Sequence, residues 1–345
     1  MKQYLLFVLL FITLALEAQI PAYYAPVDFG LSGTALRDEL GDHITSTHTS
    51  PTSYSECWDV LKNSDLDPTN SSDVLLMYGY NDGDGDITND RTRNKNDNGG
   101  SVGEWNREHV FPKSLGSPDL GTSGPGSDPH NLRASDVQMN GNRSNKKFAD
   151  ASGNAGPISS YWYPGDEWKG DAARIIMYMY LRYENRCLPS AVAIGSSNAI
   201  DGNMVNILLE WNAEDPVSEF EQNRNDEIHD ATGNRNPFID NPYIATRIWG
   251  GNPAEDTWGN LGITTENINF SIYPNPASQG IVNISIPNAA AEIIRISDLT
   301  GKTILNYTPI YSANVQINVS EIPVGTYLLS VQTAEGIEVK KLIIQ

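Results

Sequence analysis

The sequence is poor in cysteine, in histidine and in positive charge. Its 345 residues include two cysteines, five histidines and 23 Lys and Arg against 43 Asp and Glu. Two cysteines are too few for a zinc site made of cysteines alone. In an exported protein Cys57 and Cys187 could form one disulfide or stay as free thiols, and the sequence leaves both outcomes open. The formal net charge of −20 argues against tight binding of a polyanion through a broad basic surface.

Long apolar runs are lacking beyond the first residues of the chain. Residues 1–18 contain one Lys, an apolar run and small residues near Ala18, which is the pattern of a signal peptide. The apolar run, residues 5–16, is too short to span a bilayer comfortably. We therefore expect an exported protein with no integral membrane segment.

The acidic excess is not uniform along the chain. Residues 101–150 carry six basic and six acidic side chains, so this stretch is neutral within an acidic protein. An enzyme that binds its substrate transiently does not need a broad basic footprint. The net charge therefore weakens a nucleic-acid function without excluding it.

Apolar spacing predicts a mostly helical first domain over residues 19–262, with short strands around a loop-rich centre. Helical spacing recurs in residues 23–44, 53–65, 135–150, 170–186 and 203–215. Ser135 and Gln138 fit a capping box at the start of the third of these helices. Together with the strands expected near the C-terminus, this pattern predicts an α+β chain.

The composition changes after a short linker at residues 263–269. Alternating apolar segments separated by turns predict a small all-β domain over residues 270–345. Four of its blocks resemble the C-terminal sorting domain of proteins exported by the type IX secretion system: residues 273–278, 296–302, 319–331 and 340–345. The resemblance implies a β-sandwich, passage across the outer membrane by the type IX machinery and removal of the domain on export. An ordinary adhesive β-sandwich is the alternative.

The segment EWNREHVFPKS, residues 104–114, places Glu108 beside His109. A neutral imidazole can take a proton from water near neutral pH. Mg²⁺ prefers oxygen ligands, so Glu108 could supply a carboxylate and Asn140, on the predicted helix, an uncharged amide oxygen. In a regular strand Glu108 and His109 would face opposite sides. A shared site therefore requires the strand to end or bend there, and Pro112 favours an ending.

Phosphate contacts are expected from basic residues on the same segments. Asn140, Arg143 and Ser144 are spaced i, i+3 and i+4, so they share a face of the predicted helix. Arg143 would then lie one turn from the metal-binding amide, and its planar guanidinium suits phosphate oxygens. Lys113 and Arg133 would add weaker phosphate contacts.

Several motifs together resemble the bacterial endonuclease I family, secreted nonspecific nucleases with a ββα-metal active site. They occupy residues 32–40, 106–114, 128–145, 169–174 and 233–242. The resemblance implies that His109 is the general base and that Glu108 and Asn140 bind the metal ion, with Mg²⁺ expected and Mn²⁺ or Ca²⁺ as alternatives. It also implies a mostly helical nuclease domain around a ββα core, hydrolysis of DNA and RNA to 5′-phosphate products, and backbone contacts in place of base readout. We expect a monomer.

Two other functions fit parts of the sequence. The alternating acids Asp82, Asp84 and Asp86 could hold a structural Ca²⁺, although an EF-hand pattern is lacking and a solvated loop is the alternative. With the β-domain, such a loop would suit a calcium-stabilised surface adhesin without catalysis. A metal phosphodiesterase acting on small substrates would retain the same core chemistry.

Two other residues have roles to be decided by the fold. His130 is expected to be structural, and Arg174 could face either the site or a buried acid.

Overall fold

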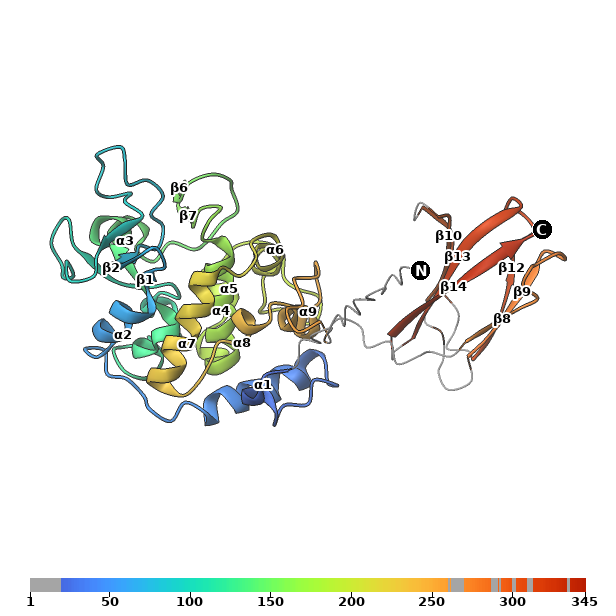
Figure 1. Ribbon diagram of the computed structural model, residues 1–345, viewed down its shortest axis with the longest axis horizontal. Helices are drawn as coiled ribbons and strands as arrows, with labels where there is room; N and C mark the ends of the chain where they lie inside the picture. The colour runs from blue at the N-terminus through green and yellow to red at the C-terminus, as the bar shows by residue number, and fades with distance from the viewer. Residues whose placement is uncertain are drawn as a thin grey trace, which may run out of the picture. The chain divides into compact units, whose positions relative to one another are not determined.

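The computed structural model describes residues 20–259, 261, 270–286, 291, 293–299, 302–308, 313–333 and 336–345. The predicted signal peptide at 1–18 and the predicted linker at 263–269 lie outside the described residues. The chain divides between Leu261 and Gly262 into two compact units, each of which is described by itself (Figure 1). Within the described ranges, no helix combines the length and the apolar character needed to cross a bilayer.

The first unit is mainly helical, as predicted. Its α-helices are α1 (Gly33–Ser46), α2 (Cys57–Ser64), α3 (Val137–Arg143), α4 (Lys169–Tyr183), α5 (Pro189–Val192), α6 (Asn206–Glu214), α7 (Glu219–Thr232), α8 (Pro237–Asp240) and α9 (Tyr243–Trp249). Helix α4 is the centre of the unit and contacts α1, α5, α6 and α8, while α7 packs on α2 and α8 (Figure 1). Every residue of α4 from Gly170 to Leu181 is buried, which confirms the buried helix predicted there.

Small antiparallel sheets lie beside these helices. They are β1 (Leu66–Asp67) with β2 (Asn70–Leu75) and β3 (Thr92–Asn94), β4 (Trp105–His109) with β5 (Leu132–Asp136), and β6 (Gly156–Ile158) with β7 (Tyr161–Tyr163). The β4–β5 pair positions the site, because its register places Glu108 opposite Arg133 and His109 opposite Leu132. Helix α3 follows β5 without a loop, so the chain forms a β-β-α unit.

The start of α3 differs from the predicted capping box. Ser135 lies inside β5, and its hydroxyl donates to the Met77 carbonyl. The N-cap is Asp136, whose carboxylate accepts from the amides of Gln138 and Met139. The helix signal was correct, but the cap lies one residue later because the hydrogen bonds of β5 continue to Asp136.

Both cysteines are free thiols and both are buried. Cys57 begins α2, where its Sγ lies 3.2 Å from the Ser127 carbonyl oxygen. Of the two outcomes that the sequence left open, the structure has the one without a disulfide.

The second unit is a β-sandwich. One sheet has the order β11 (Thr303–Tyr307), β10 (Ile293–Ser297), β13 (Gly325–Thr333) and β14 (Gly336–Ile344); the other has β12 (Asn314–Asn318), β9 (Ile281–Ser285) and β8 (Ser271–Tyr273). Alternate residues of β9, β10 and β12 are buried, and Ile284 and Ile317 of one sheet share a core with Ile294 and Leu329 of the other. This arrangement confirms the all-β region predicted from alternating apolar residues.

A buried carboxylate joins three elements of the first unit. Asp65, fully buried after α2, lies 3.0 Å from Arg224 Nε of α7 and 3.4 Å from Arg133 Nε of β5. Its Oδ2 also accepts from the backbone amide of Ala134 at 2.7 Å. Because both guanidinium groups are buried, Asp65 supplies charge that water cannot replace.

We expect Asp65→Ala to lower the free energy of unfolding of the first unit by about 3–5 kcal/mol, because it leaves two buried cations short of a partner. All seven tryptophans precede residue 262, so tryptophan fluorescence during urea unfolding reports this unit alone. Asp59→Ala, on the exposed side of α2, is the matched control and should leave the transition unchanged. A loss below about 1 kcal/mol in Asp65→Ala would contradict this account of the core.

Candidate active site

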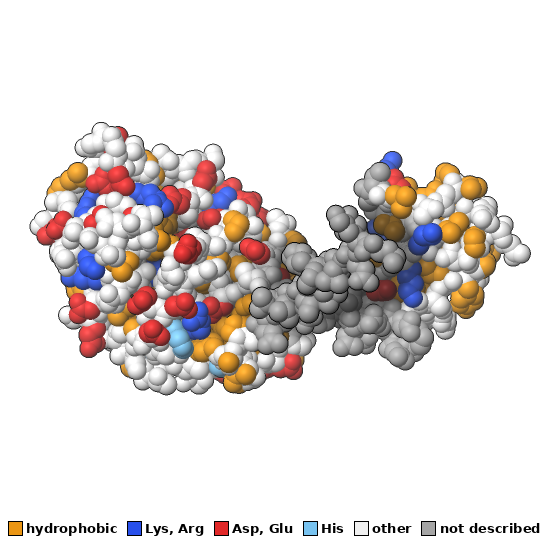
Figure 2. Space-filling view, viewed as in Figure 1, with side chains coloured by type: hydrophobic (Ala, Val, Ile, Leu, Met, Phe, Trp, Pro, Cys, Tyr) orange, Lys and Arg blue, Asp and Glu red, His pale blue; other side chains and the backbone are white. Residues whose placement is uncertain are grey.

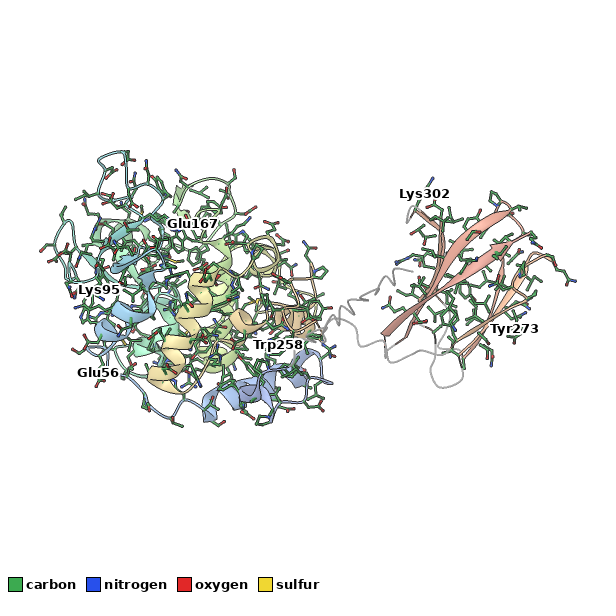
Figure 3. The ribbon with its side chains drawn as sticks, viewed as in Figure 1. Glu56, Lys95, Glu167, Trp258, Tyr273 and Lys302 are labelled. Carbon is green, nitrogen blue, oxygen red and sulfur yellow. The ribbon has the colours of Figure 1, made fainter. Side chains whose placement is uncertain are left out.

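A cleft of about 310 Å³ opens where β4 ends beside α3. It is lined by Arg107, Glu108, His109, Pro112, Lys113, Ser114, Asp119, Asn140, Ser144 and Asn145. The structure therefore brings together the predicted base, both predicted metal ligands and one predicted phosphate contact. Figure 3 shows the side chains of this unit around the ribbon.

The strand ends where the site requires it to end. His109 is the last residue of β4, and Pro112 begins the turn that follows. Glu108 points toward α3, where its carboxylate meets Arg143. His109 points to the other side and stacks on Tyr54, with ring centroids 5.6 Å apart. Both side chains reach the cleft because it lies at the end of the strand, where the two faces meet.

Glu108 is held by one of its two oxygens. Its Oε1 accepts from the Tyr78 hydroxyl at 2.9 Å and lies 3.0 Å from Arg143 Nη1. Burial raises the pKa of Glu108 to about 7, although Arg143 and the Tyr78 hydroxyl act in the opposite direction. In the described part of the chain Oε2 has no hydrogen-bond partner, so it remains available to a cation.

Tyr78, whose hydroxyl binds this carboxylate, has a strained backbone. Its φ is 75°, a region that bulky residues rarely occupy, and its side chain is fully buried against Trp162. The next residue must be glycine, because a Cβ on Gly79 would lie 2.1 Å from the Asp90 carbonyl oxygen. Backbone strain of this kind costs about 1–3 kcal/mol and persists where the surroundings enforce it. Here it places the hydroxyl on Glu108.

His109 has a defined tautomer. Its Nε2 lies 2.9 Å from the Gly126 carbonyl oxygen, and a carbonyl can only accept, so Nε2 carries the proton. In the neutral ring Nδ1 then carries a lone pair. Burial, followed by the positive charges of Lys113, Arg107 and Arg143, lowers the pKa of His109 to about 4, while the Gly126 contact raises it. The imidazole is therefore neutral near pH 7 and can accept a proton.

The loop that carries the Gly126 carbonyl is fixed from several sides. A Cβ on Gly126 would lie 2.1 Å from the Gly121 carbonyl oxygen, so only glycine fits this close approach. The next residue, Ser127, exchanges two hydrogen bonds with Thr52, each of 2.8 Å. The orientation of His109 thus depends on segments far apart in the sequence.

Asn140 completes a set of oxygen atoms that suits a hard cation. Its Nδ2 donates to Asn106 Oδ1 at 2.7 Å, which leaves its own Oδ1 without a partner among the described residues. Asn140 and Glu108 line the same cleft. One carboxylate and one amide are enough for Mg²⁺, which usually retains several waters. The residues present therefore fit the metal ion that the sequence predicts.

The structure corrects the roles predicted for Arg143 and Arg133. Arg143 is fully buried and donates to the carbonyls of His109 and Val110 at 2.9 and 2.6 Å, so it orients the site from inside. Arg133 is also fully buried, and its Nη1 lies 2.7 Å from Asp171 Oδ2. Neither guanidinium is placed to bind a phosphate in the cleft. Their sequence positions gave no sign of the acids that pair with them.

Arg174 likewise faces a buried acid. Its Nε and Nη2 donate to the two carboxylate oxygens of Glu221 at 2.6 and 2.8 Å. Of the two alternatives that the sequence left open for Arg174, the structure shows this one.

For the acidic loop the sequence left a Ca²⁺ site and a solvated loop open, and the structure shows the local hydrogen bonds of its carboxylates. Its carboxylates accept local hydrogen bonds: Asp82 from the amides of Arg91 and Thr92, Asp84 from Asp86, and Asp86 from Thr88. Across the described ranges, no group of three or more His, Cys, Asp or Glu side chains could hold a metal ion. The alternating acids of this loop stabilise its turns.

Three residues at or beside the cleft were not singled out from the sequence. Arg107 lines the cleft, Tyr54 supports the His109 ring and Tyr78 holds Glu108. Arg107 could have been found, because it stands two residues before His109 on the same strand and therefore on the same side. The two tyrosines come from distant segments, and nothing in the local sequence indicates their contacts.

His130 is structural, as the sequence suggested. It is fully buried and its ring lies 4.4 Å from that of Tyr178. Burial lowers the pKa of His130 to about 3; Asp128 opposes this shift, whereas Arg224 and His48 reinforce it. The folded chain therefore holds the neutral ring, whereas the unfolded chain protonates near the ordinary pKa of 6.5.

This difference makes the unfolding free energy depend on pH. The contribution of His130 is fully present above pH 6.5 and is lost as the pH falls from about 6.5 toward 3, by up to about 1.4 kcal/mol for each pH unit. We expect His130→Phe to flatten the curve of stability against pH in this range, measured by urea unfolding at several pH values. Equal slopes in both proteins would show that His130 is not buried in its neutral form.

Comparison with known proteins identifies the family to which the chain belongs. Residues 32–243 match the Endonuclease I family, and residues 271–345 match the secretion system C-terminal sorting domain. An extracellular ribonuclease of Bacillus subtilis (strain 168) is 42% identical over 244 residues, which cover 67% of this chain and 80% of that protein. An extracellular ribonuclease of Bacillus amyloliquefaciens is 41% identical over 245 residues, which cover 68% of this chain and 80% of that protein. The chain therefore belongs to the endonuclease I family and is a nuclease with a secretion sorting domain, located outside the cell or at its surface.

Proposed function

We propose that this protein is a metal-dependent endonuclease that hydrolyses phosphodiester bonds in DNA and RNA and leaves 5′-phosphate ends. One observation carries the proposal: His109, Glu108 and Asn140 line one cleft, His109 Nδ1 has a lone pair, and among the described residues Glu108 Oε2 and Asn140 Oδ1 have no hydrogen-bond partner. The name of the two Bacillus relatives supports RNA as a substrate, and the family name supports internal cleavage.

In this proposal His109 prepares the nucleophile. Nδ1 takes a proton from a water molecule while Nε2 keeps its own proton on the Gly126 carbonyl. The water oxygen then forms a bond to phosphorus, the bond from phosphorus to the 3′ oxygen breaks, and the departing oxygen takes a proton from solvent. The product carries a 5′-phosphate. Stacking on Tyr54 keeps the ring in place during this transfer.

Glu108 and Asn140 would hold the divalent cation, which when bound would supply positive charge for the phosphate and the departing oxygen. Mg²⁺ is the cation proposed, with Mn²⁺ and Ca²⁺ as alternatives. Arg143 and Tyr78 fix Glu108 Oε1, so the free oxygen has one orientation. Asn140 contributes an oxygen without adding negative charge that would repel the substrate.

Cleavage without base preference follows from the same cleft. Its lining contains cationic and amide side chains that suit a phosphate backbone. We propose that the chain acts as a monomer, since the residues assigned to the reaction all come from one copy. The sorting domain directs export through the type IX machinery, and the signal peptide expected at residues 1–18 would begin that route.

We expect the full-length protein to cut plasmid DNA and single-stranded RNA in Mg²⁺ and to cut neither in EDTA. His109→Ala should lose at least about 100-fold in rate, because it removes the proton acceptor. His229→Ala, which removes an imidazole outside the cleft, is the matched control. A chromogenic small diester should be cleaved far more slowly than plasmid. Full plasmid cleavage by His109→Ala would reject the assigned base, and faster cleavage of the small diester would favour a small-substrate phosphodiesterase.

The metal ligand has a separate test. Glu108→Gln keeps the size of the side chain but loses its charge, so we expect the Mg²⁺ concentration for half-maximal activity to rise by roughly tenfold or more. Mn²⁺ binding measured by electron paramagnetic resonance should weaken in parallel. Glu104→Gln removes a carboxylate that caps the Ser101 amide in the same segment, and it should change neither value. An unchanged Mn²⁺ affinity in Glu108→Gln would reject its role.

A further inference from the structure

Arg107 is a cation without a carboxylate partner. Within the described residues it forms no ion pair, whereas the other two arginines of this β-β-α unit are paired, Arg133 with Asp65 and Asp171 and Arg143 with Glu108. It lines the same cleft as His109 and Asn140. The chain has a net charge of −20, so acidic partners are plentiful, and an unpaired arginine in the cleft needs an explanation. Figure 2 shows how widely acidic side chains spread over the visible face of this unit.

Aromatic rings hold the Arg107 guanidinium. Its central carbon lies 3.6 Å from the centroid of the Tyr54 ring and 4.1 Å from that of Trp58. One of its nitrogens, Nη1, donates to the Tyr54 carbonyl. Burial lowers the pKa of Arg107, as expected for a cation that is partly removed from water and not neutralised. Such stacking uses the face of the guanidinium. Because Nη1 is bonded to the Tyr54 carbonyl and Nε is buried with no hydrogen-bond partner among the described residues, the N–H groups left for an anion are those of Nε and Nη2.

The same rings connect Arg107 to the proposed base. Tyr54 stacks on His109, with ring planes 27° apart, and also contacts Arg107. Contacts thus run from Trp58 through Arg107 and Tyr54 to His109, and of these residues Arg107 and His109 line the cleft. Lys113, which also lines the cleft, has its Nζ 5.5 Å from the Tyr54 ring centroid, so a second cation lies near these groups. A phosphate within reach of a water on His109 would therefore also meet positive charge.

We propose that Arg107, held between Tyr54 and Trp58, binds the phosphate of the bond that is cut. This assignment rests on the proposed nuclease function and deepens it. The guanidinium replaces the phosphate contacts predicted for Arg143 and Arg133, which are buried in ion pairs. Because the contact is made to the backbone, it serves DNA and RNA equally and reads no base.

The test measures nucleic-acid binding in a background that does not cut. We compare His109→Ala with the double variants His109→Ala/Arg107→Gln and His109→Ala/Arg107→Lys, all as full-length protein with Mg²⁺. The probe is a fluorescein-labelled 16-base-pair duplex, and fluorescence anisotropy gives its Kd at several NaCl concentrations. Lys95→Gln in the same background is the charge control, since Lys95 lies on the outside of the first unit and does not line the cleft (Figure 3).

We expect Arg107→Gln to weaken binding roughly tenfold and to reduce the slope of log Kd against log salt by about 0.9, the change for one lost phosphate contact. Arg107→Lys should restore the slope but only part of the affinity, because an ammonium lacks the planar fork. Lys95→Gln should change neither quantity. Tryptophan fluorescence checks that each variant is folded.

Two results would overturn the inference. Arg107→Gln could bind within twofold of its parent with the same salt slope, or Lys95→Gln could lose as much affinity. If Arg107→Gln fails to fold, an Arg107→Lys variant with the full affinity of its parent would also overturn the inference, because it would show that binding does not need the stacked guanidinium. A wild-type protein that cuts no nucleic acid would instead reject the proposed function, so the two failures can be told apart.

Discussion

The ion pair between Arg143 and Glu108 is the interaction on which the site depends. Both side chains are almost completely buried, and Arg143 also binds the carbonyls of His109 and Val110. One guanidinium therefore ties α3 to the end of β4 and fixes the carboxylate beside it. Loss of either partner would leave an unpaired charge in the interior. The pair leaves one oxygen of Glu108 free, and this oxygen gives the proposed function its metal ligand.

Some of the neighbouring groups orient Glu108 and His109 from the interior, and others lie at the cleft. Tyr78 and Arg143 reach Glu108 from inside, and the Gly126 carbonyl fixes the tautomer of His109. Arg107 lines the cleft, and the Tyr54 ring packs against both Arg107 and His109. A strongly acidic chain can in this way place cations locally, because Arg107 and Lys113 line the same cleft as His109. The net charge of the chain then affects the long-range attraction of a charged substrate more than it affects the reaction in the cleft.

The sequence predicted the parts of the fold and of the site that are encoded locally. The segment around Glu108 and His109, the helix with Asn140 and the β-sandwich were all found from short-range pattern and from resemblance to known families. Roles that depend on distant partners were not. Arg133 was predicted to contact phosphate, because Asp65 and Asp171, which pair with it in the folded chain, come from two other segments. The capping box missed by one residue because β5 extends to Asp136. Strain at Tyr78 is a property of the folded backbone, so no local pattern reports it.

The central claim is that Glu108 and Asn140 share one cation in reach of His109. The most direct measurement is the anomalous scattering of crystals of the His109→Ala protein soaked in Mn²⁺. The account predicts one strong peak in the cleft, bonded to Glu108 Oε2 and Asn140 Oδ1. A peak at the Asp82–Asp86 loop with none in the cleft, or no peak at millimolar Mn²⁺, would contradict it.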